Sequence, residues 1–223
     1  MKYLQKGNLK YIEQGKGETI LFFHGFGMSP FLYKSIIDYL SKKYHVVAPF
    51  IVSYKNFRSI EKTISELVGD KKIILIGHSA GGIAAENFAT DFNGQIKALI
   101  LMDALGGGSE QSSWGDIFKE SFRRLTHPNK ITRLMFKDIL GQMPRIIKLM
   151  TEIKYILAFK AEVKINFPVL ILWGNRDTLI QTINAEKLHK RLKGSKLNII
   201  DGDHFWFLDH QKTFEKEFAK FIK

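Results

Sequence analysis

The chain has 223 residues, of which 45% are hydrophobic and 25% are charged, as in an ordinary globular protein with a sizeable core. It contains no cysteine, which excludes disulfides, thiolate metal ligands and a cysteine nucleophile. The formal net charge of +12 is spread along the chain and accompanies no nucleic-acid-binding motif, so we expect solvated surface charge and no nucleic-acid partner.

Apolar segments alternate with amphipathic ones along most of the chain. Two alternating runs at 2–6 and 8–14, separated by Gly7, indicate a β-hairpin. Further strands are expected at 19–23, 45–48, 72–76, 96–102, 167–173 and 196–200, and helices at 30–42, 59–68, 83–90, 185–192 and 213–222. Strands that are apolar throughout and alternate with helices predict an α/β fold. Its mostly parallel, twisted sheet of about eight strands should be covered on both faces, with the hairpin as an antiparallel edge.

Residues 106–166 break this alternation and predict a small helical cap inserted into a single domain that spans 1–223. The apolar residues of the cap either line an acyl or alkyl pocket or pack the cap onto the core: Trp114, Phe118, Phe122, Met135, Phe136, Met143, Met150, Tyr155 and Phe159. Its basic residues would give a weak attraction to anionic substrates or surfaces: Arg123, Arg124, Arg133, Lys137, Arg145 and Lys148.

The strongest chemical motif is Gly77-His78-Ser79-Ala80-Gly81, which joins a buried strand to a helix. A Gly-x-Ser-x-Gly string in this setting is typical of a nucleophile elbow, a tight turn that presents a serine hydroxyl above the sheet. Residues beside the serine must lack bulk in so tight a turn, and Gly77 and Gly81 meet this need. The alternative is an ordinary glycine-rich turn between strand and helix.

Four segments in this order make the chain resemble the α/β-hydrolase superfamily, in its branch of small serine esterases with a helical cap. They are Leu21-Phe-Phe-His24-Gly25-Phe26-Gly27, the elbow 77–81, Leu172-Trp-Gly-Asn-Arg-Asp177 and Gly202-Asp-His204-Phe205. The resemblance implies a triad in the chain order Ser, Asp, His. Ser79 matches the nucleophile, His204 the base and Asp177 the acid that orients the base.

Some residues around this triad remain open to another interpretation. Asp103 also follows a strand, where some lipases of the fold carry the acid, and is therefore a rival to Asp177. The resemblance further implies an oxyanion hole formed by the backbone N–H groups of Phe26 and Ala80. His24 is expected to be structural, and the loop 49–54 departs from the glycine-rich pattern often found in the family. No metal-ligand spacing or cofactor motif is found.

The expected function is hydrolysis of a carboxylic ester in a small-molecule acyl substrate, without a cofactor and through an acyl-enzyme. A thioesterase, a carbon–carbon hydrolase or a perhydrolase would use the same triad, and some members of the fold only bind ligands. The N-terminus lacks the apolar core of a signal peptide, and no segment is apolar over roughly 20 residues. We therefore expect a cytoplasmic protein with no stable membrane insertion.

Overall fold

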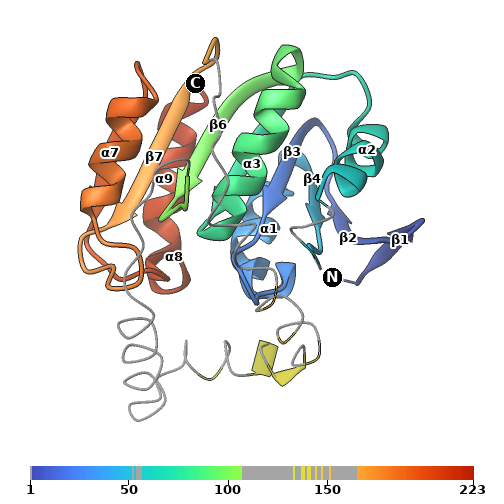
Figure 1. Cartoon of the computed structure of the whole chain (residues 1–223), viewed down its shortest axis with the longest axis horizontal. Coiled ribbons are helices and arrows are strands. Elements are labelled where there is room, and N and C mark those ends of the chain that lie inside the picture. Colours follow the sequence, from blue (N-terminus) through green and yellow to red (C-terminus); the bar gives the residue numbers. More distant parts are fainter. Residues whose placement is uncertain are drawn as a thin grey trace.

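The structure is a computed structural model that describes residues 2–51, 53, 57–106, 133, 137, 138, 140, 141, 144, 147, 151 and 165–223. Eight strands in this part of the chain form one sheet in the order β1-β2-β4-β3-β5-β6-β7-β8 (Figure 1). The predicted α/β fold with about eight strands is thus confirmed. Most of the predicted cap, 106–166, lies outside the described residues, so the cap and the single-domain boundary stay predictions.

The sheet combines an antiparallel edge with a parallel body. The strands are β1 (Leu4–Lys6), β2 (Leu9–Gln14), β3 (Glu18–Phe23), β4 (Tyr44–Pro49), β5 (Ile73–His78), β6 (Ile96–Met102), β7 (Val169–Gly174) and β8 (Lys196–Ile200). β1 and β2 form the expected hairpin, and β2 pairs antiparallel with β4. All other pairs are parallel. The carboxyl ends of the parallel strands therefore meet at one edge, where ligands bind in open α/β sheets.

Helices cover both faces of the sheet, as the apolar strands predict. They are α1 (Lys34–Leu40), α2 (Phe57–Val68), α3 (Ala80–Asp91), α7 (Ile183–Arg191), α8 (Trp206–Asp209) and α9 (Gln211–Phe221). One core packs under α2, α3 and α7, and the other under α1, α8 and α9 (Figure 1). Successive residues of a strand point to opposite faces. Leu75 of β5 accordingly enters the first core and Ile76 the second.

Three helices differ from the sequence prediction. The helix expected at 30–42 is split into a 3-10 turn, Pro30–Tyr33, and α1, and Ser29 caps the start of the turn by accepting the Phe31 N–H. α3 begins at Ala80 although two glycines follow, since close packing against the sheet requires them there. α8 was not predicted. Asp203 starts it by accepting the N–H of Phe205 on its carboxylate and that of Trp206 on its carbonyl.

No helix among the described residues has the length and apolar character to cross a bilayer.

Candidate active site

Ser79 occupies a strained turn between β5 and α3. Its backbone has φ 53° and ψ −128°, a sparsely populated conformation for a residue with a Cβ that costs about 1–3 kcal/mol. The Ser79 N–H donates to the carbonyl of Met102 at 3.0 Å, and its carbonyl accepts the N–H groups of Gly82 and Leu105, both at 2.9 Å. The side chain is half-buried. This is the strand–turn–helix geometry of a nucleophile elbow.

Glycines make this turn possible, as the motif predicts. A Cβ on Gly77 would lie 2.6 Å from the Gly81 carbonyl oxygen, and a Cβ on Gly81 would lie 2.3 Å from that of Phe23. A Cβ on Gly82 would lie 2.5 Å from the Ala104 Cβ. All three distances are shorter than van der Waals contact, and two of them involve backbone atoms that cannot rotate away. The absence of side chains therefore lets α3 approach β3 and the end of β6 closely.

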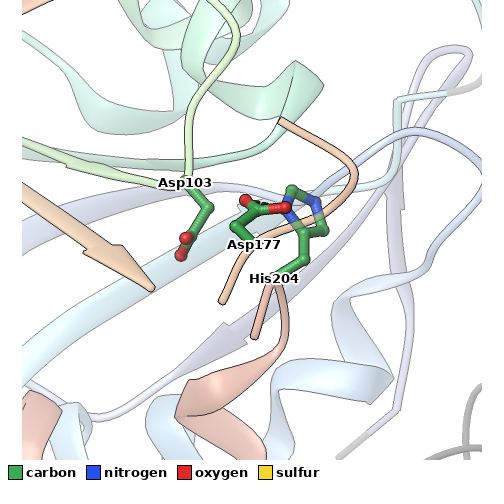
Figure 2. Close-up of side chains that lie close together, drawn as sticks. All are labelled: Asp103, Asp177 and His204. Atoms are coloured by element: carbon green, nitrogen blue, oxygen red, sulfur yellow. Dashed lines mark hydrogen bonds and ion pairs between the residues drawn. The ribbon is translucent and has the colours of Figure 1, made fainter. Parts of the chain in front are cut away.

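The structure brings His204 and Asp177 together. The ring Nδ1 lies 2.7 Å from Asp177 Oδ2, and both residues are buried (Figure 2). Asp177 Oδ1 accepts the N–H groups of Leu179 at 2.8 Å and Ile180 at 2.9 Å, which fixes the carboxylate. With Nδ1–H donating to the carboxylate, Nε2 keeps a lone pair that can accept a proton. The described residues include no hydrogen bond between this ring and the Ser79 hydroxyl, a bond that often tightens only with substrate.

Asp103, the rival acid, does not contact the His204 ring. It is fully buried, its Oδ1 accepts the Gly174 N–H at 2.7 Å, and its Oδ2 accepts the Trp206 indole N–H at 2.6 Å. Oxygen and nitrogen atoms of Asp103, Asp177 and His204 nevertheless lie within 4.8 Å of one another. Such a group could in principle hold a metal. Since all four carboxylate oxygens already accept N–H donors, the geometry favours a hydrogen-bonded acid–base group.

The predicted oxyanion segment, residues 24–27, lies beside the turn at Ser79. A Cβ on Gly25 would come within 3.2 Å of the Ser79 Cβ and within 3.2 Å of His78 Nδ1. Ala80 is the first residue of α3, where backbone N–H groups have no acceptor within the helix. The two segments are therefore adjacent, and the assignment of the Phe26 and Ala80 N–H groups as oxyanion donors stays a prediction.

His24 ties the oxyanion segment to the loop after β4, as expected for a structural residue. It is buried, its Nδ1–H donates to the Gly25 carbonyl at 2.8 Å, and its Nε2 accepts the Ile51 N–H at 3.0 Å. The second bond holds the backbone of Ile51, which lies in the atypical loop 49–54.

A buried chain of hydrogen bonds through Tyr33 and His78 was not predicted. The Gly25 N–H donates to the Tyr33 hydroxyl at 3.0 Å, which lies 2.7 Å from His78 Nδ1. His78 Nε2 lies 3.0 Å from the His204 carbonyl oxygen. A neutral His78 with the proton on Nε2 satisfies every partner, because the tyrosine then donates to Nδ1. Burial, and next the neighbouring His204, hold the pKa of His78 well below its ordinary value.

These bonds connect the oxyanion segment, the elbow and the His204 loop. Nothing in the sequence singled out Tyr33, because its hydroxyl reaches His78 only through the tertiary fold. A histidine before the serine was visible in the motif, but its partners were not.

A second unpredicted contact reaches the insertion. The Ser29 N–H donates to Asp138 Oδ2 at 2.7 Å, and the Ser29 hydroxyl donates to Asp138 Oδ1. Arg133 and Lys137 of the predicted basic cap are exposed. The other proposed cap residues lie outside the described part of the chain: Trp114, Phe118, Phe122, Arg123, Arg124, Met135, Phe136, Met143, Arg145, Lys148, Met150, Tyr155 and Phe159.

Comparison with known proteins decides the family. A sequence model described as "Alpha/beta hydrolase family" matches residues 20–217. The chain belongs to the alpha/beta hydrolase family. It is 22% identical over 239 residues to a pimeloyl-[acyl-carrier protein] methyl ester esterase from Legionella pneumophila (strain Lens), covering 97% of this chain and 100% of that protein. It is 24% identical over 248 residues to the esterase of the same name from Wigglesworthia glossinidia brevipalpis, covering 94% and 95%.

A solved structure of another hydrolase superposes well on this one. The meta-cleavage product hydrolase CumD from Pseudomonas fluorescens IP01 superposes with a TM-score of 0.79 at 19% identity, covering 96% of this chain and 93% of that one. At this level of identity the likeness shows a shared fold.

Proposed function

We propose that this alpha/beta hydrolase is a serine hydrolase that cleaves a carboxylic ester through an acyl-enzyme, with Ser79 as nucleophile, His204 as base and Asp177 as orienting acid. The observation that carries the proposal is the buried hydrogen bond of 2.7 Å between His204 Nδ1 and Asp177 Oδ2. It presents an imidazole of defined tautomer at the edge of the sheet where the strained turn presents Ser79. Hydrolysis by a serine needs such a hydroxyl together with a base that is held in one tautomer.

In the proposed reaction the Ser79 hydroxyl oxygen attacks the ester carbonyl carbon while Nε2 of His204 takes the hydroxyl proton. The negative charge that develops on the carbonyl oxygen is stabilised by the Phe26 and Ala80 N–H groups. The imidazolium returns its proton to the departing alcohol, which leaves an acyl group on Ser79. Water then repeats the two steps, with His204 as base, and releases the acid.

Asp177 has two tasks in this mechanism. Its hydrogen bond keeps the ring proton on Nδ1, so that Nε2 remains the basic nitrogen. Its charge stabilises the imidazolium that forms when Ser79 loses its proton. The backbone N–H groups on Oδ1 hold the carboxylate still, and so reduce the reorganisation needed during the reaction.

Support for an ester as substrate comes from the relatives whose names describe methyl ester esterases. The name of CumD describes a meta-cleavage product hydrolase, so carbon–carbon bond hydrolysis is the alternative reaction for the same triad. We expect a small-molecule acyl substrate, and weak attraction of anionic groups to the basic cap.

Labelling with a fluorophosphonate probe, which reacts with activated serines, followed by peptide mapping tests the proposal. We expect one adduct on Ser79, its loss in Ser79→Ala, and labelling at least 100-fold slower in His204→Ala. Ser29→Ala is the control at a serine outside the proposed triad, and it should label like the wild type. Turnover of p-nitrophenyl esters together with a carbon–carbon cleavage substrate then separates the two reactions. An adduct elsewhere, or none, would contradict the proposed nucleophile.

A further inference from the structure

His78 is a buried histidine that the proposed triad does not use. It is the last residue of β5, directly before Ser79, and its side chain is completely buried. Its ring Nδ1 lies 2.7 Å from the Tyr33 hydroxyl, and its Nε2 lies 3.0 Å from the backbone carbonyl oxygen of His204. The residue before the proposed nucleophile is therefore hydrogen-bonded to the backbone of the proposed base.

The neighbours of His78 leave only one arrangement of its ring proton. The His204 carbonyl oxygen can only accept, so Nε2 carries the hydrogen that points at it. The Tyr33 hydroxyl accepts the Gly25 N–H at 3.0 Å and donates its own proton to Nδ1. The other neutral tautomer would leave two acceptors, Nε2 and the carbonyl oxygen, facing each other without a proton between them. The hydrogen bonds therefore run in one direction, from the Gly25 N–H to the His204 carbonyl.

Aromatic packing holds the His78 ring against the segment that carries His204. The Phe207 ring meets it edge to face with the centroids 4.8 Å apart, and the Phe205 ring lies at 5.7 Å. Tyr33 stacks on Phe207 with the centroids 5.1 Å apart. Both phenylalanines follow closely after His204. This segment therefore packs around the ring and also accepts its N–H.

The other end of the chain of hydrogen bonds orients the oxyanion segment. The Gly25 N–H donates to Tyr33. The Gly25 carbonyl accepts His24 Nδ1–H at 2.8 Å and the Met28 N–H at 3.2 Å. This carbonyl and the Phe26 N–H belong to one planar, trans peptide unit and point in opposite directions. Bonds on both sides of Gly25 therefore fix the direction in which the Phe26 N–H points.

We propose that His78, together with Tyr33, is a positioning residue that holds the proposed base and the oxyanion segment at a fixed distance from the proposed nucleophile. It acts through backbone atoms of its neighbours. The bond from Asp177 fixes the tautomer of the His204 ring, whereas the bond from His78 fixes the His204 backbone relative to Ser79. Because this role concerns the proposed triad, the inference rests on the proposed function.

A neutral His78 ring suits this role. Burial, and next the neighbouring His204, hold its pKa well below the ordinary value, and His24 acts in the same direction. The bond to the His204 carbonyl acts in the opposite direction. The rings of His78 and His204 have their centroids 4.8 Å apart. A positive charge on His78 would therefore lower the pKa of the ring that has to accept the Ser79 proton.

Two amide variants separate the two bonds of His78. In His78→Gln the amide nitrogen is as many bonds from Cα as Nε2, so it can still donate to the His204 carbonyl. In His78→Asn the amide matches the place of Nδ1, so it can still accept from Tyr33 but does not reach His204. We expect His78→Gln to keep kcat within about tenfold of the wild type. His78→Asn should lose about 100-fold, as a misplacement of about 1 Å does, with KM within about twofold in both.

The kcat values are taken per active site, which is counted by fluorophosphonate labelling carried to completion. A loss of folded protein then lowers the number of sites but not the kcat of each site. If His78 only stabilises the fold, the two amide variants will have equal kcat values per site, which would overturn the proposal. A loss that appears mainly in KM would overturn it too.

Tyr33→Phe tests the other bond and also serves if His78→Asn does not fold. It removes the hydroxyl that joins the Gly25 N–H to His78, and kcat per site should fall about tenfold with KM unchanged. Tyr39→Phe is the matched control, because its hydroxyl donates to the Glu215 carbonyl at 3.4 Å, where α1 meets α9. It should keep kcat within about twofold. Equal kcat values in the two phenylalanine variants would overturn the proposal.

A measurement on the wild type does not depend on activity. Heteronuclear NMR of the histidine rings shows which ring nitrogen carries the proton, and the His78 signals are assigned by their loss in His78→Gln. We expect a neutral ring with the proton on Nε2 from about pH 6 to about pH 8. A proton on Nδ1, or on both nitrogens, would overturn the proposed chain of hydrogen bonds.

The two proposals fail in different ways. If the wild type neither turns over esters nor labels at Ser79, the proposed function fails, while the NMR experiment still reports the direction of the hydrogen bonds. If the wild type is active but His78→Gln and His78→Asn have the same kcat per site, only the role of His78 fails.

Discussion

The residues that directly follow β5 and β6 both have a positive φ, but their side chains differ in burial and in hydrogen bonding. Ser79 and Asp103 are the two non-glycine residues with positive φ in the described part of the chain, with values of 53° and 42°. They follow neighbouring parallel strands, and the Ser79 N–H donates to Met102, the residue before Asp103. The serine is half-buried, whereas the aspartate is completely buried.

This difference teaches that strain has two uses at the carboxyl edge of one sheet. At β5 the turn leaves the serine half-buried, and its side chain makes no hydrogen bond with the described residues that would offset the strain. At β6 the turn directs a carboxyl group inward, where two N–H donors repay it. Replacement by glycine should therefore raise the free energy of unfolding at Ser79 and lower it at Asp103.

The largest effect is expected for Ser79→Gly. Without the proposed nucleophile, kcat should fall by a factor of about 10⁴–10⁶. The free energy of unfolding should rise by about 0.5–1 kcal/mol, because glycine adopts positive φ without strain. Ester turnover and urea denaturation measure the two quantities. Ser79→Ala is the matched control, which should lose the activity without gaining the stability. A glycine variant no more stable than the alanine variant would contradict strain at this turn.

Removal of Asp177, the proposed acid, should have the next largest effect. Asp177→Ala should lower kcat by a factor of about 10³–10⁴, since the imidazole loses both its fixed tautomer and its counter-charge. Steady-state kinetics on an ester measures the loss. Asp201 is a suitable control because it lies on the segment after β8 that carries His204 and pairs at the surface with Arg176. Asp201→Ala should leave kcat within about twofold, and equal losses in the two variants would refute the choice of acid.

Close packing beneath the β5 turn predicts a large loss of stability for Gly81→Ala. The added Cβ would lie 2.3 Å from the Phe23 carbonyl oxygen, and backbone atoms must move to accommodate it. We expect the free energy of unfolding to fall by about 2–3 kcal/mol, as for overpacked cores. Gly94→Ala, where no heavy atom lies within 4 Å of the new Cβ, should change it by less than about 1 kcal/mol. Urea denaturation of both variants compares them directly.

Asp103→Gly tests the β6 end against Ser79→Gly. Glycine relieves the positive φ here too, but it leaves the N–H groups of Gly174 and Trp206 without their acceptor. The free energy of unfolding should therefore fall by about 1–3 kcal/mol. A gain in stability in the same urea experiment would show that relief of strain after β6 outweighs the loss of the buried hydrogen bonds.

The smallest effect concerns His78, which precedes Ser79. Because folding lowers its pKa, the unfolded chain takes up a proton below about pH 6.5 while the native residue stays neutral. The wild type should lose up to about 1.4 kcal/mol per pH unit relative to His78→Gln as the pH falls through this range. Denaturation curves at pH 5, 6, 7 and 8 measure the difference. A constant difference between the two proteins would mean that folding leaves the pKa of His78 unchanged.

The sequence predicted the fold well because its signals are local. Strands at 96–102 and 196–200 match the structure to the residue, since each is a short run bounded by turn residues. The helix boundaries were less accurate. α3 begins earlier than its glycines suggest, and α8 depends on capping by Asp203, which the pattern of apolar residues does not reveal.

The candidate site was only partly accessible from the sequence. Ser79, His204 and Asp177 were named from motifs, and the structure places the last two in contact. Asp103 could not be separated from Asp177 by sequence, because both follow apolar strands. The contacts of Asp103 with Gly174 and Trp206, and of Tyr33 with His78, join residues at least 45 positions apart.

The sequence by itself therefore predicted the succession of strands and helices along the chain, the turn at Ser79 and the residues proposed as nucleophile, base and acid. These follow from hydrophobic periodicity and from glycines at fixed offsets, which act over a few residues. Only the tertiary structure decided which acid forms a hydrogen bond with the His204 imidazole and which buried groups hold the loops together. Parallel pairing brings distant strand ends to one edge, and the direction in which each strained turn points its side chain is set by packing across that edge.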